Sequence, residues 1–159
     1  MRNEVTLRGL FVPLGLVALA TCVTDPAEFV ETVLIASDSI VSSSDPIEIE
    51  VVATNVGTSS VQVDAHGCPQ LFMVMDAQGV VVGPEPVACL AVLLPPRTLL
   101  PGESLGFSYS WSGGAAFADG AQLPEGLYQV RGWVLVVSGG QVYTNTLDVR
   151  VIDILNQHK

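Results

Sequence analysis

The sequence has few positive charges. It contains six Lys and Arg residues against sixteen Asp and Glu residues, which gives a formal net charge of −10. Binding to nucleic acid, and electrostatic attachment to an anionic bilayer, both depend on clusters of basic side chains. The sequence therefore argues against both. Its acidic residues are dispersed along the chain, which is typical of a solvated surface that keeps an apolar domain soluble.

Histidine is also scarce, since the chain holds only His66 and His158. Nucleophilic catalysis needs a base that is positioned by a third group, and His66 is the sole candidate in the region expected to fold. The sequence contains no phosphate-binding glycine loop and no H-E-x-x-H motif. Glu48 and Glu50 share one face of a predicted strand, as solvated neighbours do. We therefore predict a protein that is not an enzyme and that uses no cofactor.

The chain also lacks an apolar run long enough to span a bilayer. Residues 1–22 begin with two arginines and continue with an apolar run from Gly9 to Ala20, which Pro13 interrupts. Such a segment is too short for a transmembrane helix and is typical of an export signal. Its end, Leu19-Ala20-Thr21-Cys22, resembles the lipobox of bacterial lipoproteins, although Thr21 replaces the usual Gly, Ala or Ser. The resemblance implies cleavage before Cys22 and acylation of its thiol.

A rival cleavage after Ala20 would release a secreted, soluble protein. It would also leave Cys22 as an unpaired thiol in an oxidising compartment, so we favour the lipid anchor. Multiple acyl chains anchor a protein stably without a transmembrane helix. Val23 and Thr24 lack the Asp that often retains lipoproteins in the inner membrane. The lipoprotein resemblance thus implies an extracytoplasmic protein on the cell envelope, at the outer membrane if the host has one.

The length of 159 residues suits one domain. We assign residues 23–28 to a short tether, 29–153 to the domain and 154–159 to a tail. Apolar and polar residues alternate in Pro46–Thr54, in Leu105–Trp111 and from Tyr128 to Val136, as in half-buried strands. About seven to nine such short strands, separated by turns, predict an all-β, immunoglobulin-like antiparallel β-sandwich.

Several local expectations accompany this fold. Ser37–Pro46 is serine-rich and predicts a loop, and Val61–Val63 is expected to return antiparallel to the strand at 46–54. Hairpins are predicted around Asp76–Gly79 and Ser138–Gln141. The strand after the second turn is expected to carry four side chains on one face, namely Tyr143, Leu147, Val149 and Val151. Leu90–Leu94 is a further strand candidate, and no helix is predicted.

If Cys22 carries lipid, the two remaining cysteines are Cys68 and Cys89, an even pair in an exported domain. A disulfide between them would close about twenty residues and contribute ~3 kcal/mol by the chain-entropy model. A redox-active pair is the alternative. We favour the structural disulfide because redox cysteines usually lie two residues apart at a helix start.

His66 and Cys68, with Met73 and Met75 nearby, offer imidazole, thiolate and thioether ligands of the kind that copper takes. A disulfide would consume Cys68, however, and the predicted domain holds no second histidine. We therefore predict no metal site and keep copper binding at His66 as an alternative.

Several motifs occur in the order found in the BsuPI (intracellular proteinase inhibitor) family. They are Asn55-Val56-Gly57, the strand and turn from Phe72 to Gly79, Leu100-Pro101-Gly102-Glu103-Ser104 before the aromatic strand, and Leu123-Pro124-Glu125-Gly126-Leu127-Tyr128. Over about Ile47 to Val151 the chain resembles this family, which implies an immunoglobulin-like domain and inhibition of a serine protease. The export signal and the cysteine pair depart from an intracellular inhibitor.

The sequence thus predicts a lipid-anchored module that acts by binding and not by catalysis. The loops Gly113–Gln122 and Gly83–Ala88 are candidate contact surfaces, because loops on a rigid sandwich commonly carry recognition. Trp133 occupies an outward position in its strand and is a candidate anchor for a partner. A secreted proteinase inhibitor and an envelope copper protein are the alternatives. The partner and the oligomeric state do not follow from the sequence.

Overall fold

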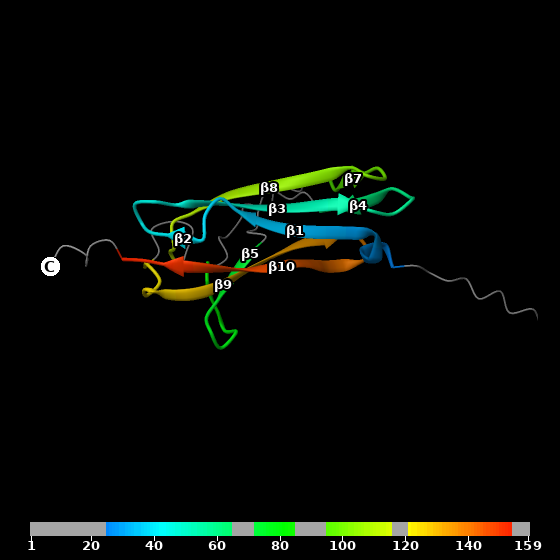
Figure 1. The fold of residues 1–159 in the computed structure, drawn as a ribbon. Coiled ribbons are helices and arrows are strands. Elements are labelled where there is room, and N and C mark those ends of the chain that lie inside the picture. The colour runs from blue at the N-terminus through cyan, green and yellow to red at the C-terminus, as the bar shows by residue number, and fades with distance from the viewer. Residues whose placement is uncertain (1–24, 65–71, 85–94, 116–120, 154–159) are drawn as a thin grey trace, which may run out of the picture.

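The computed structural model describes residues 25–64, 72–84, 95–115 and 121–153. These residues form two β-sheets that pack face to face, with β1, β3 and β8 in one layer and β9 and β10 in the other (Figure 1). The elements, in chain order, are the 3₁₀ helix η1 (Pro26–Phe29) and the strands β1 (Val30–Ala36), β2 (Ile40–Val41), β3 (Ile47–Asn55), β4 (Val61–Val63), β5 (Phe72–Met75), β6 (Val81–Gly83), β7 (Arg97–Leu99), β8 (Ser104–Trp111), β9 (Gly126–Val136) and β10 (Gly140–Val151).

One sheet has three strands in the order β1-β3-β8. The other has seven, with the order β2-β10-β9-β4-β7 and with β5 pairing both β9 and β6. All described pairs are antiparallel except β2 with β10. The prediction of an all-β, immunoglobulin-like sandwich is confirmed. No helix in the described residues is long and apolar enough to cross a membrane.

The core is formed by the alternating apolar positions that the sequence predicts. In β3 every second side chain from Ile47 to Ala53 is buried, and in β9 every second residue from Tyr128 to Val136 is buried. Between the sheets, the Phe72 ring lies 5.6 Å from that of Tyr109 and 6.3 Å from that of Trp111, in tilted and edge-on geometries that aromatic pairs favour.

The expected pairing of Val61–Val63 with the strand before it is wrong. β4 pairs with β7 and β9 in the seven-stranded sheet, whereas β3 pairs with β1 and β8 in the other sheet. The chain changes sheets in the loop after Asn55, whose buried side-chain amide donates to the carbonyls of Ser59 and Leu99 at 2.9 and 3.0 Å. These bonds direct the chain across the sandwich, so the turn does not close a hairpin.

The loop expected at Ser37–Pro46 contains the short strand β2. The chain leaves the three-stranded sheet after Ala36 and joins the seven-stranded sheet beside the end of β10. Arg150 N–H donates to the Ser39 carbonyl at 2.7 Å, and Ile152 N–H donates to the Val41 carbonyl at 3.0 Å. This strand is only two residues long, so it shows no alternation of apolar and polar residues within the serine-rich segment. The sequence therefore did not predict it.

The hairpin between β9 and β10 is present, but the expected face of Tyr143 is wrong. Leu147, Val149 and Val151 point inward as predicted, whereas Tyr143 is 43% exposed and Thr144 is buried. The register between β10 and β9 shifts between Tyr143 and Thr146. Beyond an extra residue in one strand, the side chains of that strand point to the opposite face of the sheet. Tyr143 therefore lies on the outer face.

Two of the motifs that resemble the BsuPI family meet at one end of the sandwich. Asn55 N–H donates to the Glu103 carbonyl at 2.9 Å, and Gly102 N–H donates to the Asn55 carbonyl at 2.8 Å. The Glu103 carboxylate accepts a hydrogen bond from Leu100 N–H at 2.7 Å, and Gly102 has a φ of +80°, which favours glycine. These motif residues therefore build the turn between β7 and β8.

The motif Leu123–Tyr128 forms a tyrosine corner. The hydroxyl of Tyr128 donates to the Pro124 carbonyl at 2.9 Å, four residues upstream, where the chain turns into β9. This bond is a recurring feature of immunoglobulin-like sandwiches. The Leu123–Tyr128 motif therefore also has a structural explanation in this fold.

Candidate functional site

Four residues predicted to carry lipidation, the disulfide or copper lie outside the described residues: Cys22, His66, Cys68 and Cys89. Met73 and Met75 are described, half-buried on the outer face of β5. Within the described ranges, no group of three His, Cys, Asp or Glu side chains converges in a way that could hold a metal ion.

The two loops predicted to form contact surfaces meet in their described parts. An added Cβ at Gly83 would lie only 3.0 Å from Ala115 Cα, so the end of β6 packs closely against the base of the Gly113–Gln122 loop. That base is held by hydrogen bonds from Ala115 N–H to the Ala121 carbonyl and from Leu123 N–H to the Gly113 carbonyl. Residues 85–88 and 116–120 of these loops lie outside the described residues.

A cluster of large side chains lies on the outer face of the seven-stranded sheet. Trp133 of β9 is directly opposite Tyr143 of β10, and Arg131 of β9 is directly opposite Met73 of β5. The Arg131 guanidinium carbon lies 4.5 Å from the centre of the Tyr143 ring, within the range of a cation–π interaction. We call Met73, Arg131, Trp133 and Tyr143 the outer cluster.

The guanidinium of Arg131 is incompletely paired. Its Nε atom is buried and has no hydrogen-bond partner. No ion pair joins Arg131 to an acidic side chain within the described part of the chain. A half-buried cation without a carboxylate partner is unusual in a chain with a net charge of −10. The remaining guanidinium donors can therefore bind an acidic group that comes from outside the domain.

Exposed groups extend the outer cluster along the sheet. Leu135 follows Trp133 at the next outward position and is 40% exposed. The hydroxyl of Tyr143 donates to Gln141 Oε1 at 2.8 Å, which holds the ring against the sheet. The surface therefore combines aromatic, aliphatic and cationic groups whose positions are set by the strands.

The sequence placed Trp133 on this surface but missed the contribution of Tyr143. Regular alternation from Val151 back along β10 assigns Tyr143 to the core, and only the register shift turns it outward. The available signal is the polar run Thr144-Asn145-Thr146, which interrupts the apolar alternation of this strand. A polar interruption of a core-facing pattern is the kind of place where bulges occur.

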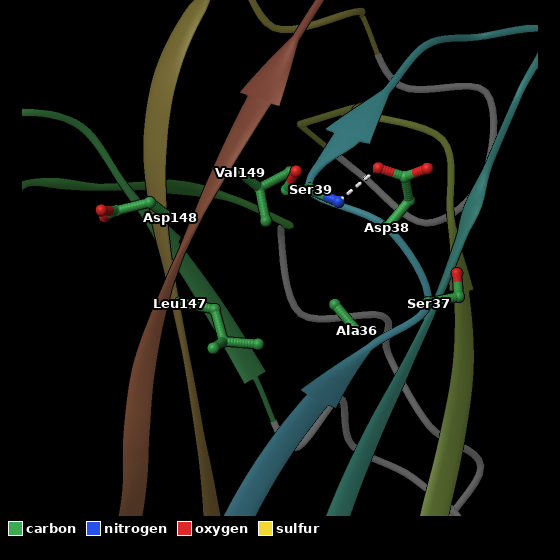
Figure 2. A pocket seen from close by; sticks show the side chains of 7 residues that line it. All are labelled: Ala36, Ser37, Asp38, Ser39, Leu147, Asp148 and Val149. Carbon is green, nitrogen blue, oxygen red and sulfur yellow. Dashed lines mark hydrogen bonds between the residues drawn. The ribbon is translucent and has the colours of Figure 1, made fainter.

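A pocket of about 410 Å³ opens where the chain switches sheets between β1 and β2. It is lined by Ala36, Ser37, Asp38, Ser39, Leu147, Asp148 and Val149, which come from both sheets (Figure 2). Its two carboxylates do not face each other. Asp38 Oδ1 accepts hydrogen bonds from Ser39 and Ile40 N–H at 2.6 and 3.1 Å, while Asp148 points away from the others (Figure 2). The pocket thus lacks a carboxylate pair for acid–base chemistry.

Comparisons with known proteins identify no family. No protein-family model matches the chain, and no curated protein matches it. Among solved structures, the CARDB domain of the PF1109 protein from Pyrococcus furiosus, in complex with di-metal ions, is 16% identical, with 77% of this chain and 87% of that chain covered and a TM-score of 0.39.

Two larger proteins contain similar regions. The alkylpurine DNA glycosylase AlkC from Pseudomonas fluorescens is 12% identical, with 79% of this chain and 31% of that chain covered and a TM-score of 0.45. A beta-glucosidase from Listeria innocua is 14% identical, with 79% of this chain and 16% of that chain covered and a TM-score of 0.37. At these identities the similarity concerns the β-sandwich fold alone.

Proposed function

We propose that this chain is a non-catalytic binding module that is exported and tethered to the cell envelope by lipid on Cys22. The outer cluster is its recognition surface, and the partner is a protein that presents a carboxylate within an apolar patch. The observation that carries this proposal is Arg131, a half-buried cation that stacks on Tyr143 and has no acidic partner in the described chain.

The composition of the outer cluster supports binding to a protein. Tyr, Trp, Met and Arg are enriched in protein interfaces, and Trp, Tyr and Arg dominate their hot spots. The strands fix these side chains before binding, which lowers the entropy cost of association. An incoming carboxylate would pair with Arg131 while apolar groups around it cover Trp133 and Leu135.

Site-specific photocrosslinking in the producing cells tests this surface. A photoreactive phenylalanine analogue at Tyr143 should give a discrete adduct, because Tyr143 is exposed beside Arg131. The same analogue at Leu127, 59% exposed at the far end of β9, is the matched control and should give much less. The crosslinked partner peptide should contain Asp or Glu beside apolar residues.

A second change separates recognition from chance proximity. Arg131→Gln, combined with the analogue at Trp133, should reduce the adduct about tenfold, since a desolvated charge-assisted hydrogen bond is lost. The proposed surface would be contradicted if Arg131→Gln gave as much adduct as the chain with Arg131. A crosslinked partner peptide without acidic residues would contradict it as well.

The lipid anchor rests on the lipobox resemblance at Leu19–Cys22. Cells that express the chain should incorporate radiolabelled palmitate into it, and Cys22→Ala should abolish the label. Absence of label from the unaltered chain, or equal labelling of the variant, counts against acylation. Release of the Cys22→Ala chain into the medium would indicate the rival cleavage after Ala20.

Inhibition of a serine protease is the second candidate function, because the motifs between Asn55 and Tyr128 follow the order of the BsuPI family. A purified chain truncated before Cys22 should then slow a secreted serine protease at stoichiometric dose. No effect across a protease panel removes this candidate. Copper binding by His66 is tested separately, since it predicts metal uptake that His66→Ala abolishes.

A further inference from the structure

Among the described strands, β8 is an edge strand of the three-stranded sheet. Within the described part of the chain it pairs only with β3. Hydrogen-bonded and non-hydrogen-bonded pairs alternate along an antiparallel ladder. Asn55 N–H donates to the Glu103 carbonyl just before β8 begins, so the odd-numbered residues of β8 form the hydrogen-bonded pairs with β3. The even-numbered residues of β8 therefore direct their N–H and C=O groups away from β3. They are Ser104, Gly106, Ser108 and Ser110, and all four are exposed.

This edge lacks the features with which proteins prevent strand addition. Natural edge strands are often short or carry lysine, proline, inward-pointing charges or bulges. β8 has eight residues with none of these residue types, and its register with β3 is continuous from Ser104 to Trp111. Its backbone is therefore a regular template for another extended chain.

The two faces beside the edge differ in chemistry. On the inner face, Leu105, Phe107 and Tyr109 are only partly buried, although they pack against the core. An added strand would bring its own inward side chains against these three. Apolar residues at every second position of the added chain fit this face.

The outer face beside the edge is acidic. Glu48 lies opposite Ser110, and Glu50 lies opposite Ser108, one strand in from the edge. Glu50 also reaches across Gly106, because an added Cβ at Gly106 would lie 2.5 Å from its Oε1 atom. Its carboxylate is therefore directed toward the open edge. Basic residues at the outward positions of an added strand would meet this charge.

We infer that β8 binds an extended segment of a partner protein by strand addition, and that this segment alternates basic and apolar residues. Main-chain hydrogen bonds to the four outward residues of β8 supply affinity, and the alternating side chains supply specificity. A second copy of this chain is a poorer occupant. Antiparallel pairing of two β8 strands would bring acidic outer faces with Glu50 toward each other.

The inference is independent of the proposed function, because β8 and the outer cluster lie on different sheets. The probe is a capped synthetic peptide as long as β8 in which lysine and valine alternate. The control peptide alternates glutamate and valine. Titration of the fluorescent peptides with the full chain in nonionic detergent should show saturable binding of the lysine peptide and at least tenfold weaker binding of the glutamate peptide.

Two variants locate the binding. Ser108→Pro removes an outward N–H without removing a bond to β3, so the ladder survives, and it should weaken binding about tenfold. Ser108→Ala keeps the N–H and should bind like the unaltered chain. Glu50→Gln should weaken binding about threefold and reduce its dependence on salt.

A lysine–valine peptide with N-methylated amides on its pairing edge tests strand addition without any variant, and it should not bind. The inference is overturned if this peptide binds as well as its unmethylated form, or if the glutamate peptide binds equally. It is also overturned if Ser108→Pro folds and leaves the affinity unchanged. Concentration-dependent dimerisation that Ser108→Pro abolishes would assign the edge to a second copy instead.

Discussion

The side-chain amide of Asn145 hydrogen-bonds both backbone polar groups of Leu34. Its Oδ1 accepts from Leu34 N–H at 2.7 Å, and its Nδ2 donates to the Leu34 carbonyl at 3.3 Å. Leu34 belongs to the edge strand β1 of one sheet, and Asn145 lies in β10 of the other. A single side-chain amide thus satisfies the backbone groups of Leu34 that a further strand beside β1 would otherwise bond. It joins the two sheets at the β1 edge.

Asn145→Ala tests this link. The change leaves the N–H and C=O of Leu34 without protein partners, so we expect a loss of about 1 kcal/mol in the free energy of unfolding. Urea denaturation followed by tryptophan fluorescence measures it. Thr146→Ala, at an exposed neighbour in β10, is the control and should change stability by less than about 0.5 kcal/mol. Equal losses for the two variants would contradict the role given to the amide.

Thr144→Val tests what holds the register shift in β10. The buried Thr144 hydroxyl accepts from Gly132 N–H at 2.8 Å and donates to the Asn145 carbonyl at 2.6 Å. Valine has a similar shape but leaves these groups unpaired, which should cost about 2 kcal/mol. Urea denaturation measures this loss in the free energy of unfolding. Thr54→Val removes an exposed hydroxyl bond to Ser104 and should cost much less.

The inward positions of the sandwich were predictable because apolar and polar residues alternate regularly in β3, β8 and β9. The hairpin turns were predictable because Gly79 and Gly140 adopt positive φ values that favour glycine. The sheet to which each strand belongs was less accessible. β4 and β2 change sheets through hydrogen bonds of Asn55 and Ser39 that have no periodic signal.

The candidate site was predictable only in part for the same reason. Trp133 follows the alternation of β9 and was assigned to the outer face. Tyr143 depends on the register shift, so its stacking with Arg131 could not be deduced from a period of two. The open edge at β8 depends on which strands become neighbours, and long-range pairing is not encoded locally in the sequence of Ser104–Trp111.

Tyr128→Phe tests the tyrosine corner. The change removes the hydroxyl bond to the Pro124 carbonyl without creating a large cavity, so we expect a loss of about 1.5 kcal/mol in the free energy of unfolding. Tyr143→Phe is a matched control, because its hydroxyl bond to Gln141 is exposed. That variant should lose less than about 0.5 kcal/mol. The two losses are compared by urea denaturation, and a larger loss for Tyr143→Phe would refute the assignment.

Asn55→Ala should be the most damaging of these substitutions. The buried Asn55 amide donates to the carbonyls of Ser59 and Leu99, and its oxygen accepts from Gly57 N–H at 3.0 Å. Alanine leaves all three backbone groups without this partner at the point where the chain changes sheets. We expect a loss of about 3 kcal/mol, because unpaired buried polar groups and a small cavity add their costs.

Asn145→Ala makes the same chemical change at an exposed residue with two side-chain hydrogen bonds to the backbone, so the difference between the two variants reflects the burial of Asn55 and its one additional bond. Calorimetric unfolding of both should place the Asn55→Ala transition clearly below that of Asn145→Ala. Coincident transitions would mean that the chain is guided between the sheets by its apolar residues and not by the Asn55 amide. In that case Val61 and Val63, both buried, would be the residues that position β4.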